Sequence, residues 1–248
     1  LTPQTAVWTL TARARALLSR DVGGAENPGL SWQPTAGGPL RTIQSLKGVR
    51  TFLDFISDDG RWVYFHANDR KPDAYTLYRW EKATGKRETV LDREGLWSVA
   101  DHRPDGRLLL VRELGSSVNE VHEWNPKTGT LTALLGVGER EEYTPAYGAA
   151  EGEVLVLTPK LGEFRRLYSW KGGKLTPVTP ELKHDVAGFS IDLARRRVLY
   201  TVNESGYSRP FALDARTYRP LALPKLPDND GVLVGALSRG GRFAVLRV

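Results

Sequence analysis

The chain has 248 residues, of which 40% are hydrophobic, and a formal net charge of +6. This length is ordinary for a single all-β domain with a large core, and because no run of 18 apolar residues occurs, no membrane-spanning helix is expected. Cysteine is absent, which excludes disulfides and thiolate metal sites. Basic and acidic residues are interleaved without a basic stripe, so nucleic-acid binding is not expected either.

Short apolar runs recur along the chain at a regular spacing. In the clearest copy, residues 105–129, an Asp-Gly pair opens two runs and a Thr-Gly pair closes them. These pairs favour tight β connections, and the runs between them are too short for helices. One aligned position recurs after 48, 44, 46 and 44 residues, at Trp32, Trp80, Trp124, Trp170 and Asp214. A period of about 40–50 residues is typical of β-propeller blades.

The repeats predict short strands, of which four can be placed in the first, second and fifth copies and three in the third and fourth. The strands expected in the first two are Ala6–Thr11, Ala16–Arg20, Pro28–Trp32, Leu40–Ile43, Phe52–Ile56, Trp62–Phe65, Tyr75–Trp80 and Arg87–Leu91. Those expected later are Leu96–Ala100, two runs ending near Arg112 and at Trp124, Val154–Leu157, Leu167–Trp170, Leu175–Val178, Phe189–Leu193, Val198–Tyr200, Pro210–Leu213 and Tyr218–Leu223. The fifth copy lacks the turn glycines and is expected to be the least regular.

The sequence therefore predicts an all-β fold, a β-propeller of four-stranded antiparallel blades. Five full blades are expected at residues 1–44, 45–91, 92–136, 137–180 and 181–224, and half of a sixth at 225–248, with strands at Val232–Leu237 and Phe243–Leu246. Since residues 1–44 are used by the first blade, we expect residues beyond Val248 to supply the missing strands. An open blade face of about 400 Å² costs about 10 kcal/mol at about 25 cal/mol per Å².

The aromatic residues at the aligned position are predicted to be core residues. Alternate residues of a strand face opposite sides, so Trp80 shares a face with Tyr78, and Trp124 with His122. Trp170 likewise shares a face with Tyr168. Because both faces of a propeller blade pack on neighbouring blades, these side chains are expected to lie between blades.

A search for catalytic and metal-binding patterns yields no site. No Gly-x-Ser-x-Gly nucleophile elbow occurs, and the nearest fragments, Gly115–Ser117 and Ser205–Ser208, are predicted loops. The histidines, which lack metal-ligand spacing, are His66, His102, His122 and His184. His66 and His122 lie in predicted strands, where a hydrogen-bonded position in the core or the pore is expected.

Four further segments partly match functional motifs or carry charged residues, and none of them identifies a functional site. Asp228–Gly231 lacks the downstream Glu and the helices of an EF-hand, and Gly136–Gly138 lacks the third glycine of a dinucleotide motif. Asn203–Ser205 matches a glycosylation acceptor. Arg112 and Glu113 are charged residues near a blade end, for which a salt bridge at the rim is an equal explanation. No catalytic residue, metal ligand or cofactor is assigned, and the substrate-binding residues stay open.

The sequence motifs at the start and end of the repeats resemble those of two groups of propellers. Ser57–Phe65 and Arg103–Arg107 are similar to a blade opening of the form Ser-Pro-Asp-Gly-Arg followed by aliphatic residues, and Leu77–Gly85 is similar to the closing of the same blades. This pairing is typical of the N-terminal propeller of the prolyl oligopeptidase family of serine peptidases, including acylaminoacyl peptidases. It is also typical of the propeller of the periplasmic Tol system. The Gly-His and Trp-Asp pairs of WD repeats are missing.

The resemblance to the peptidases implies a gating function. In that family a propeller covers an α/β-hydrolase domain and admits only short peptides to it. The hydrolase domain follows the propeller in the chain and carries the catalytic serine, aspartate and histidine. None of those three residues can be placed on this sequence, so the expected partners are a C-terminal hydrolase domain of the same protein and peptide substrates. The alternatives are a Tol-type or other secreted propeller that binds proteins, and a propeller that binds a small ligand or sugar. A cytoplasmic location is expected, with a periplasmic or secreted one as the alternative, and a homo-oligomer stays open.

Overall fold

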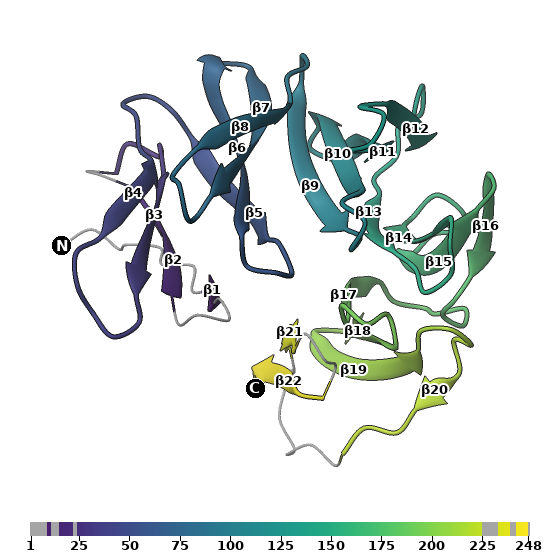
Figure 1. The fold of residues 1–248 in the computed structure, drawn as a ribbon. Coiled ribbons are helices and arrows are strands. Elements are labelled where there is room, and N and C mark those ends of the chain that lie inside the picture. The colour runs from purple at the N-terminus through teal and green to yellow at the C-terminus, as the bar shows by residue number, and fades with distance from the viewer. Residues whose placement is uncertain (1–8, 11–14, 22–23, 225–232, 239–241, 248) are drawn as a thin grey trace. The chain divides into compact units, whose positions relative to one another are not determined.

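The computed structural model describes residues 9–10, 15–21, 24–224, 233–238 and 242–247. The described residues form no helix long and apolar enough to cross a lipid bilayer. Their regular structure is a succession of antiparallel sheets, each made of strands that follow one another in the chain (Figure 1).

Five of these sheets have four strands each, and they are numbered here in chain order. Sheet 1 contains β1 (Thr9–Leu10), β2 (Arg15–Arg20), β3 (Gly29–Pro34) and β4 (Arg41–Gln44), and sheet 2 contains β5 (Thr51–Ile56), β6 (Trp62–Lys71), β7 (Ala74–Glu81) and β8 (Arg87–Leu91). Sheet 3 contains β9 (Leu96–His102), β10 (Leu108–Gly115), β11 (Val118–Trp124) and β12 (Leu131–Leu135). Sheet 4 contains β13 (Thr144–Tyr147), β14 (Glu153–Thr158), β15 (Arg166–Lys171) and β16 (Lys174–Pro177). Sheet 5 contains β17 (Val186–Ile191), β18 (Arg197–Glu204), β19 (Tyr207–Asp214) and β20 (Pro220–Leu221), and β21 (Leu233–Leu237) pairs with β22 (Ala244–Arg247).

The predicted all-β class, with five four-stranded antiparallel sheets, is confirmed. Three features differ from the expectation. β12 was not among the strands placed from the sequence. β13 was not predicted, and it contains Pro145, which an edge strand tolerates because its missing N–H is not required by a second neighbour. The hairpin of β6 and β7 is also longer than predicted, because β6 continues through polar residues to Lys71.

The chain divides into two compact units, residues 1–99 with 110–114, and residues 100–109 with 115–248. In the first unit, side chains from sheets 1 and 2 form one core. Its buried members are Leu17, Leu30, Trp32, Ile56, Val63, Phe65, Ala67, Tyr78 and Trp80. Since each fully buried large side chain contributes about 1.5–3 kcal/mol, this shared core is what joins the two sheets.

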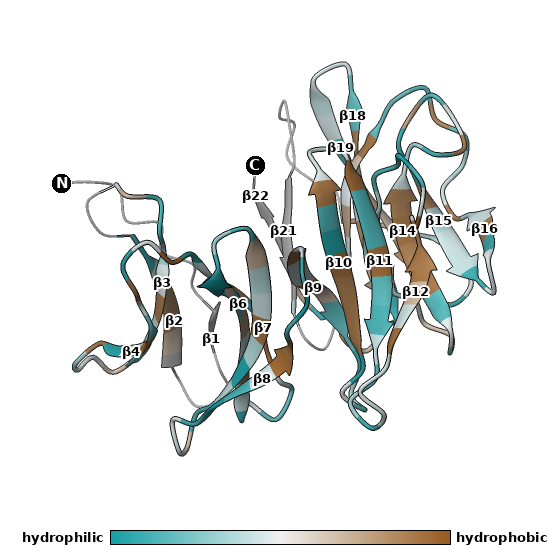
Figure 2. Cartoon of the chain, turned by 90° about the horizontal axis from the view of Figure 1, so that it is seen from above, coloured by the Kyte–Doolittle hydropathy of each residue, from teal (hydrophilic) through white to brown (hydrophobic). Residues whose placement is uncertain are grey.

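In the second unit, sheet 4 packs on both of its faces. The side chains of β14 alternate: Val154 and Val156 belong to a core with residues of sheet 3, and Leu155 and Leu157 belong to a core with residues of sheet 5. The whole of β14 is buried, and Figure 2 shows that it is hydrophobic along nearly all of its length. A strand that is apolar on both faces can be stable only between two other layers, so sheets 3, 4 and 5 form a stack.

The aligned tryptophans are only partly as predicted. Trp32 and Trp80 are buried in the core of the first unit, as expected. Trp124 and Trp170 are half-buried, and Trp170 packs against the edge of the core between sheets 3 and 4.

Candidate functional site

The turn between β17 and β18 contains an arginine in a backbone conformation that favours glycine. Arg195 has a φ of 53°, and its N–H donates to the carbonyl oxygen of Asp192 at 2.8 Å. The corresponding turns of sheets 2 and 3 place Gly60 and Gly106 there, with φ of 67° and 88° and the same type of hydrogen bond. A residue with a Cβ in this conformation costs about 1–2 kcal/mol relative to the right-handed region. The turn therefore accepts a conformational cost in order to carry the arginine side chain.

The side chain of Arg195 reaches two earlier sheets. Its two terminal nitrogens lie 2.7 and 2.8 Å from the two carboxylate oxygens of Asp101, at the end of β9. The same nitrogens donate to the carbonyl oxygens of Tyr147 and His102, at 3.2 and 3.1 Å. The side chains of Arg195 and Asp101 are only 12% and 13% exposed. This bidentate ion pair is thus largely shielded from water, where charge-assisted hydrogen bonds are strongest.

Asp101 also connects sheets 3 and 4 directly. Its carboxylate accepts a hydrogen bond of 2.8 Å from the N–H of Tyr147, in β13. In the other unit, Asp54 of β5 accepts the N–H of Val99, in β9, at 3.0 Å. An aspartate on the first strand of one sheet therefore holds the first strand of the next sheet, and sequence inspection missed this because the two aspartates stand at different distances from their turn glycines.

Each histidine of the two predicted strands lies beside a carboxylate. Nδ1 of His66 is 3.0 Å from Asp54, and Nε2 of His122 is 3.0 Å from Glu120. The predicted hydrogen-bonded positions are therefore present. His102 contributes its carbonyl oxygen to Arg195, and His184 is half-buried in a loop. Among the residues that the structure describes, no group of three or more His, Asp or Glu side chains is arranged to hold a metal ion.

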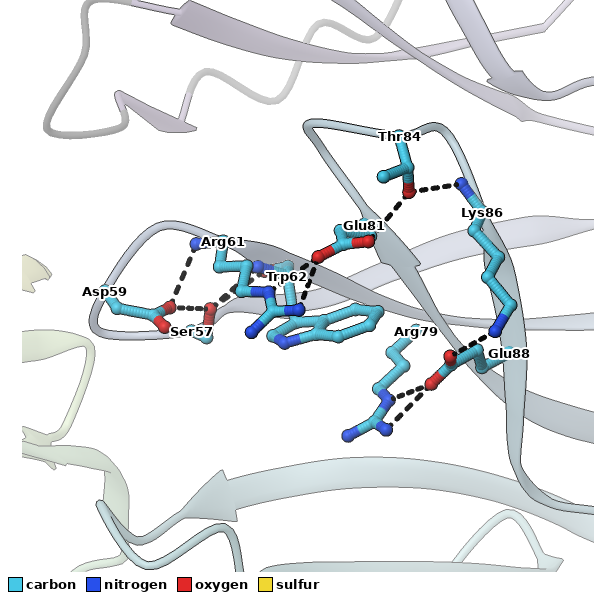
Figure 3. A network of polar contacts seen from close by, with 9 residues as sticks. All are labelled: Ser57, Asp59, Arg61, Trp62, Arg79, Glu81, Thr84, Lys86 and Glu88. Atoms are coloured by element: carbon cyan, nitrogen blue, oxygen red, sulfur yellow. Dashed lines mark hydrogen bonds and ion pairs between the residues drawn. The ribbon is translucent and has the colours of Figure 1, made fainter.

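The turns of sheet 2 carry a polar network (Figure 3). Asp59 accepts a hydrogen bond from the Ser57 hydroxyl at 2.6 Å, and this bond lowers the pKa of Asp59. Glu81 accepts from the Thr84 hydroxyl at 2.7 Å and from Arg61 at 2.6 Å, and both bonds lower its pKa. These contacts join the turn after β5 to the turn after β7.

The ring of Trp62 lies close to two arginines of the same network (Figure 3). The guanidinium carbons of Arg61 and Arg79 are 5.0 and 4.3 Å from the centre of its ring, within the range of cation–π attraction. Arg79 also pairs with Glu88 at 2.7 Å and lowers the pKa of that carboxyl group. The charges of these turns are therefore paired with one another.

A second charged network lies between sheets 3 and 4. Arg107 contacts Asp105 and Glu151, both at 2.8 Å, and the hydrogen bond with Glu151 raises the pKa of Arg107. Arg103 lies 4.6 Å from the ring centre of Tyr147, and burial raises the pKa of the Tyr147 hydroxyl. No nucleophile with an adjacent base occurs in these contacts, so they hold the turns together rather than activate a group.

Two cavities of the second unit are large enough for a small ligand. One, of about 490 Å³, is lined by the loops 161–165 and 181–183 and by Arg166 and Tyr168 of β15. Arg166 there is used structurally, since it donates to the carbonyl oxygen of Thr179. The other, of about 300 Å³, is bordered by Trp170, Glu139 and Lys160. Lys160 pairs with Glu139 at 2.5 Å, and burial, with a hydrogen bond to Glu139, raises the pKa of Tyr143 to about 12.

The remaining segments singled out from the sequence lie in turns or on the surface. Arg112 is half-buried against the ring of Trp97, and Glu113 is exposed. Ser116–Ser117 and Ser205–Gly206 lie in the hairpin turns of sheets 3 and 5, but Gly115 ends β10, and Tyr207 and Ser208 begin β19, so the two loops are shorter than predicted. Asn203 accepts a hydrogen bond from the N–H of Gly206. Asp228–Gly231 lies outside the described residues.

Comparison with known proteins gives matches in structure but not in sequence. A scan of family models gives no match, and a search of curated proteins gives none. Similar solved structures include an oligogalacturonate lyase in complex with manganese, with a TM-score of 0.67 and 15% sequence identity. That alignment covers 92% of this chain and 66% of the lyase. They also include TolB from Acinetobacter baumannii, with a TM-score of 0.61 and 16% identity over 90% of this chain and 60% of TolB. A prolyl endopeptidase has a TM-score of 0.59 and 16% identity over 92% of this chain and 44% of the endopeptidase. The likeness is one of fold. The chain spans less than two thirds of the length of each of these proteins.

Proposed function

We propose that this chain is the gating propeller of a serine peptidase of the prolyl oligopeptidase family, similar to the acylaminoacyl peptidases. In this proposal the five sheets are blades, and they restrict the access of peptides to an α/β-hydrolase domain of the same protein. The observation that carries the proposal is the fold likeness to a prolyl endopeptidase, of which this chain matches 44%, together with the opening and closing motifs of the blades. The matched part is less than half of the prolyl endopeptidase, which leaves room in that protein for a separate catalytic domain.

The chemistry of the described residues fits a gating role. The arginines and carboxylates of the turns pair with one another, and the sequence has no nucleophile elbow. A scaffold that surrounds a reaction without taking part in it acts by excluding large molecules and water. The substrates proposed are short peptides, and the location proposed is the cytoplasm.

The test is labelling of the full-length protein with a fluorophosphonate, which modifies activated serines. One labelled serine is expected in the native protein, outside residues 1–248, and labelling should be lost after heat denaturation. Competition by a short peptide should slow the labelling. A native, folded preparation without any labelled serine would contradict the proposal.

The second candidate is a protein-binding propeller of the Tol type, which the fold likeness to TolB favours. The same experiment separates the two, because a protein-binding propeller needs no activated serine. In that case a stable protein complex should be recovered from the periplasm, and peptide hydrolysis should be absent.

A further inference from the structure

Sheet 5 differs from sheets 2 and 3 at two turn positions where those sheets have glycine. Arg195 and Tyr218 have φ of 53° and 57°, where the corresponding turns of sheets 2 and 3 have glycines: Gly60 and Gly106 for the first, Gly85 and Gly129 for the second. Glycine adopts this conformation readily, and residues with a Cβ do not. A costly residue at a position where glycine suffices indicates that its side chain has a role.

Both side chains reach an earlier sheet of the second unit. The hydroxyl of Tyr218 donates to Glu153, in the neighbouring sheet 4. Arg195 goes one sheet further: it contacts the backbone of Tyr147 in sheet 4 and both the carboxylate of Asp101 and the carbonyl oxygen of His102 in sheet 3. Sheet 5 is therefore tied to a sheet that is not its neighbour in the chain.

This contact changes how the stack can open. In a protein built of repeats, each repeat contacts mainly its neighbours, so that the outer repeats can separate one at a time. The cores follow this rule, because one lies between sheets 3 and 4 and the other between sheets 4 and 5. The ion pair of Arg195 with Asp101 adds a link from sheet 5 to sheet 3 across the edge of sheet 4.

We propose that Arg195 is a latch, which ties sheets 3, 4 and 5 together so that they open as one unit and not sheet by sheet. Arginine is the residue suited to this position, since its planar group can donate in two directions while it holds a carboxylate with two bonds. The latch does not depend on the peptidase proposal, and it applies equally to a protein-binding propeller.

The test is native-state hydrogen exchange of the full-length protein, followed by mass spectrometry of peptides from each sheet. The informative variant is Arg195→Gly, because glycine suits the turn and any loss must come from the side chain. At least tenfold faster exchange is expected in β17 and β18, with sheets 1 and 2 unchanged. Arg195→Lys, which keeps the charge without the planar fork, should show most of this effect.

Two further variants test the pairing. Asp101→Asn should also accelerate exchange in β17 and β18, and the double variant Arg195→Gly with Asp101→Asn should exchange no more than threefold faster than the more affected single variant, since both remove one interaction. Arg216→Ala, which removes an exposed arginine from another turn of sheet 5, is the matched control and should leave the rates unchanged. Unchanged or slower exchange in Arg195→Gly would overturn the latch. So would a double variant in which the acceleration of exchange equals the product of the accelerations in the two single variants.

Discussion

The guanidinium group of Arg195 and the carboxylate of Asp101 meet through two contacts of 2.7 and 2.8 Å, although 94 residues separate them in the sequence. Asp101 uses the same carboxylate to accept the N–H of Tyr147. One aspartate therefore joins backbone and side-chain groups of three sheets. Removal of this carboxylate should be more damaging than removal of an exposed one, because it leaves the arginine largely buried without its counter-charge.

Asp101→Ala is predicted to lower the free energy of unfolding of the second unit by about 3–5 kcal/mol, the range for breaking a buried ion pair from one side. Urea unfolding, followed by the fluorescence of the tryptophans, measures this change. Glu163→Ala, at an exposed position of the same unit, is the control and should change stability by less than about 0.5 kcal/mol. Equal stabilities of Asp101→Ala and the control would show that the pair contributes nothing.

Tyr218→Phe should destabilise the protein by about 1 kcal/mol, the usual net contribution of one hydrogen bond. The substitution keeps the ring and the strained backbone and removes only the hydroxyl that donates to Glu153. Tyr207→Phe removes a hydroxyl from a tyrosine that is 47% exposed in a hairpin of the same sheet, and it should be neutral. The two melting temperatures are to be compared, and a Tyr218→Phe protein as stable as the Tyr207→Phe protein would refute the role given to this bond.

Gly136→Ala and Gly138→Ala provide a test of close packing at one turn. Both glycines have positive φ, 87° and 74°, so alanine costs about 1–2 kcal/mol at either position. A Cβ on residue 136 would also lie 2.4 Å from the carbonyl oxygen of Asn119, whereas a Cβ on residue 138 meets nothing within 4 Å. Gly136→Ala should therefore be clearly the less stable variant in thermal unfolding, and the reverse order would show that the turn is looser than described.

The Glu139 carboxyl group predicts a specific dependence of stability on pH. The hydrogen bond from Lys160 lowers the pKa of Glu139 below its ordinary value of 4.5. The folded state therefore binds this proton more weakly than the unfolded state does. The stability that the ionised Glu139 carboxylate contributes is complete above pH 4.5 and is lost as the pH falls through the lowered pKa. Glu139→Gln should flatten the stability curve below pH 4.5 relative to Glu163→Gln, and parallel curves for the two variants would contradict the assignment.

The regular part of the fold could be predicted because its turns depend on residues with special backbone angles. Gly60 and Gly106 are in the positive-φ conformation that the Asp-Gly pairs predict, and Gly85 and Gly129 are in that of the Thr-Gly pairs. The fifth copy lacks these glycines and was therefore expected to be irregular. It instead keeps the same turn hydrogen bonds with Arg195 and Tyr218 in their place, because contacts with other sheets compensate for the strained backbone.

Two features that escaped prediction depend on contacts between distant residues. β13 is short, and its proline disfavours a strand in any local reading, but its pairing with β14 and the bond from Tyr147 to Asp101 hold it in place. The pair of Asp101 with Arg195 has no local signal at all. A repeat predicts which residues occupy equivalent positions, and it does not predict contacts that only one of the copies makes.

The gating role is tested most directly by offering the full-length protein one cleavable sequence in two forms. The sequence is supplied as a free short peptide and as a surface loop of a stably folded carrier protein, with the carrier unfolded by reduction and alkylation as a control for accessibility. The account predicts that the free peptide is cleaved and that the folded carrier stays intact. Cleavage of both forms at the same rate would contradict it.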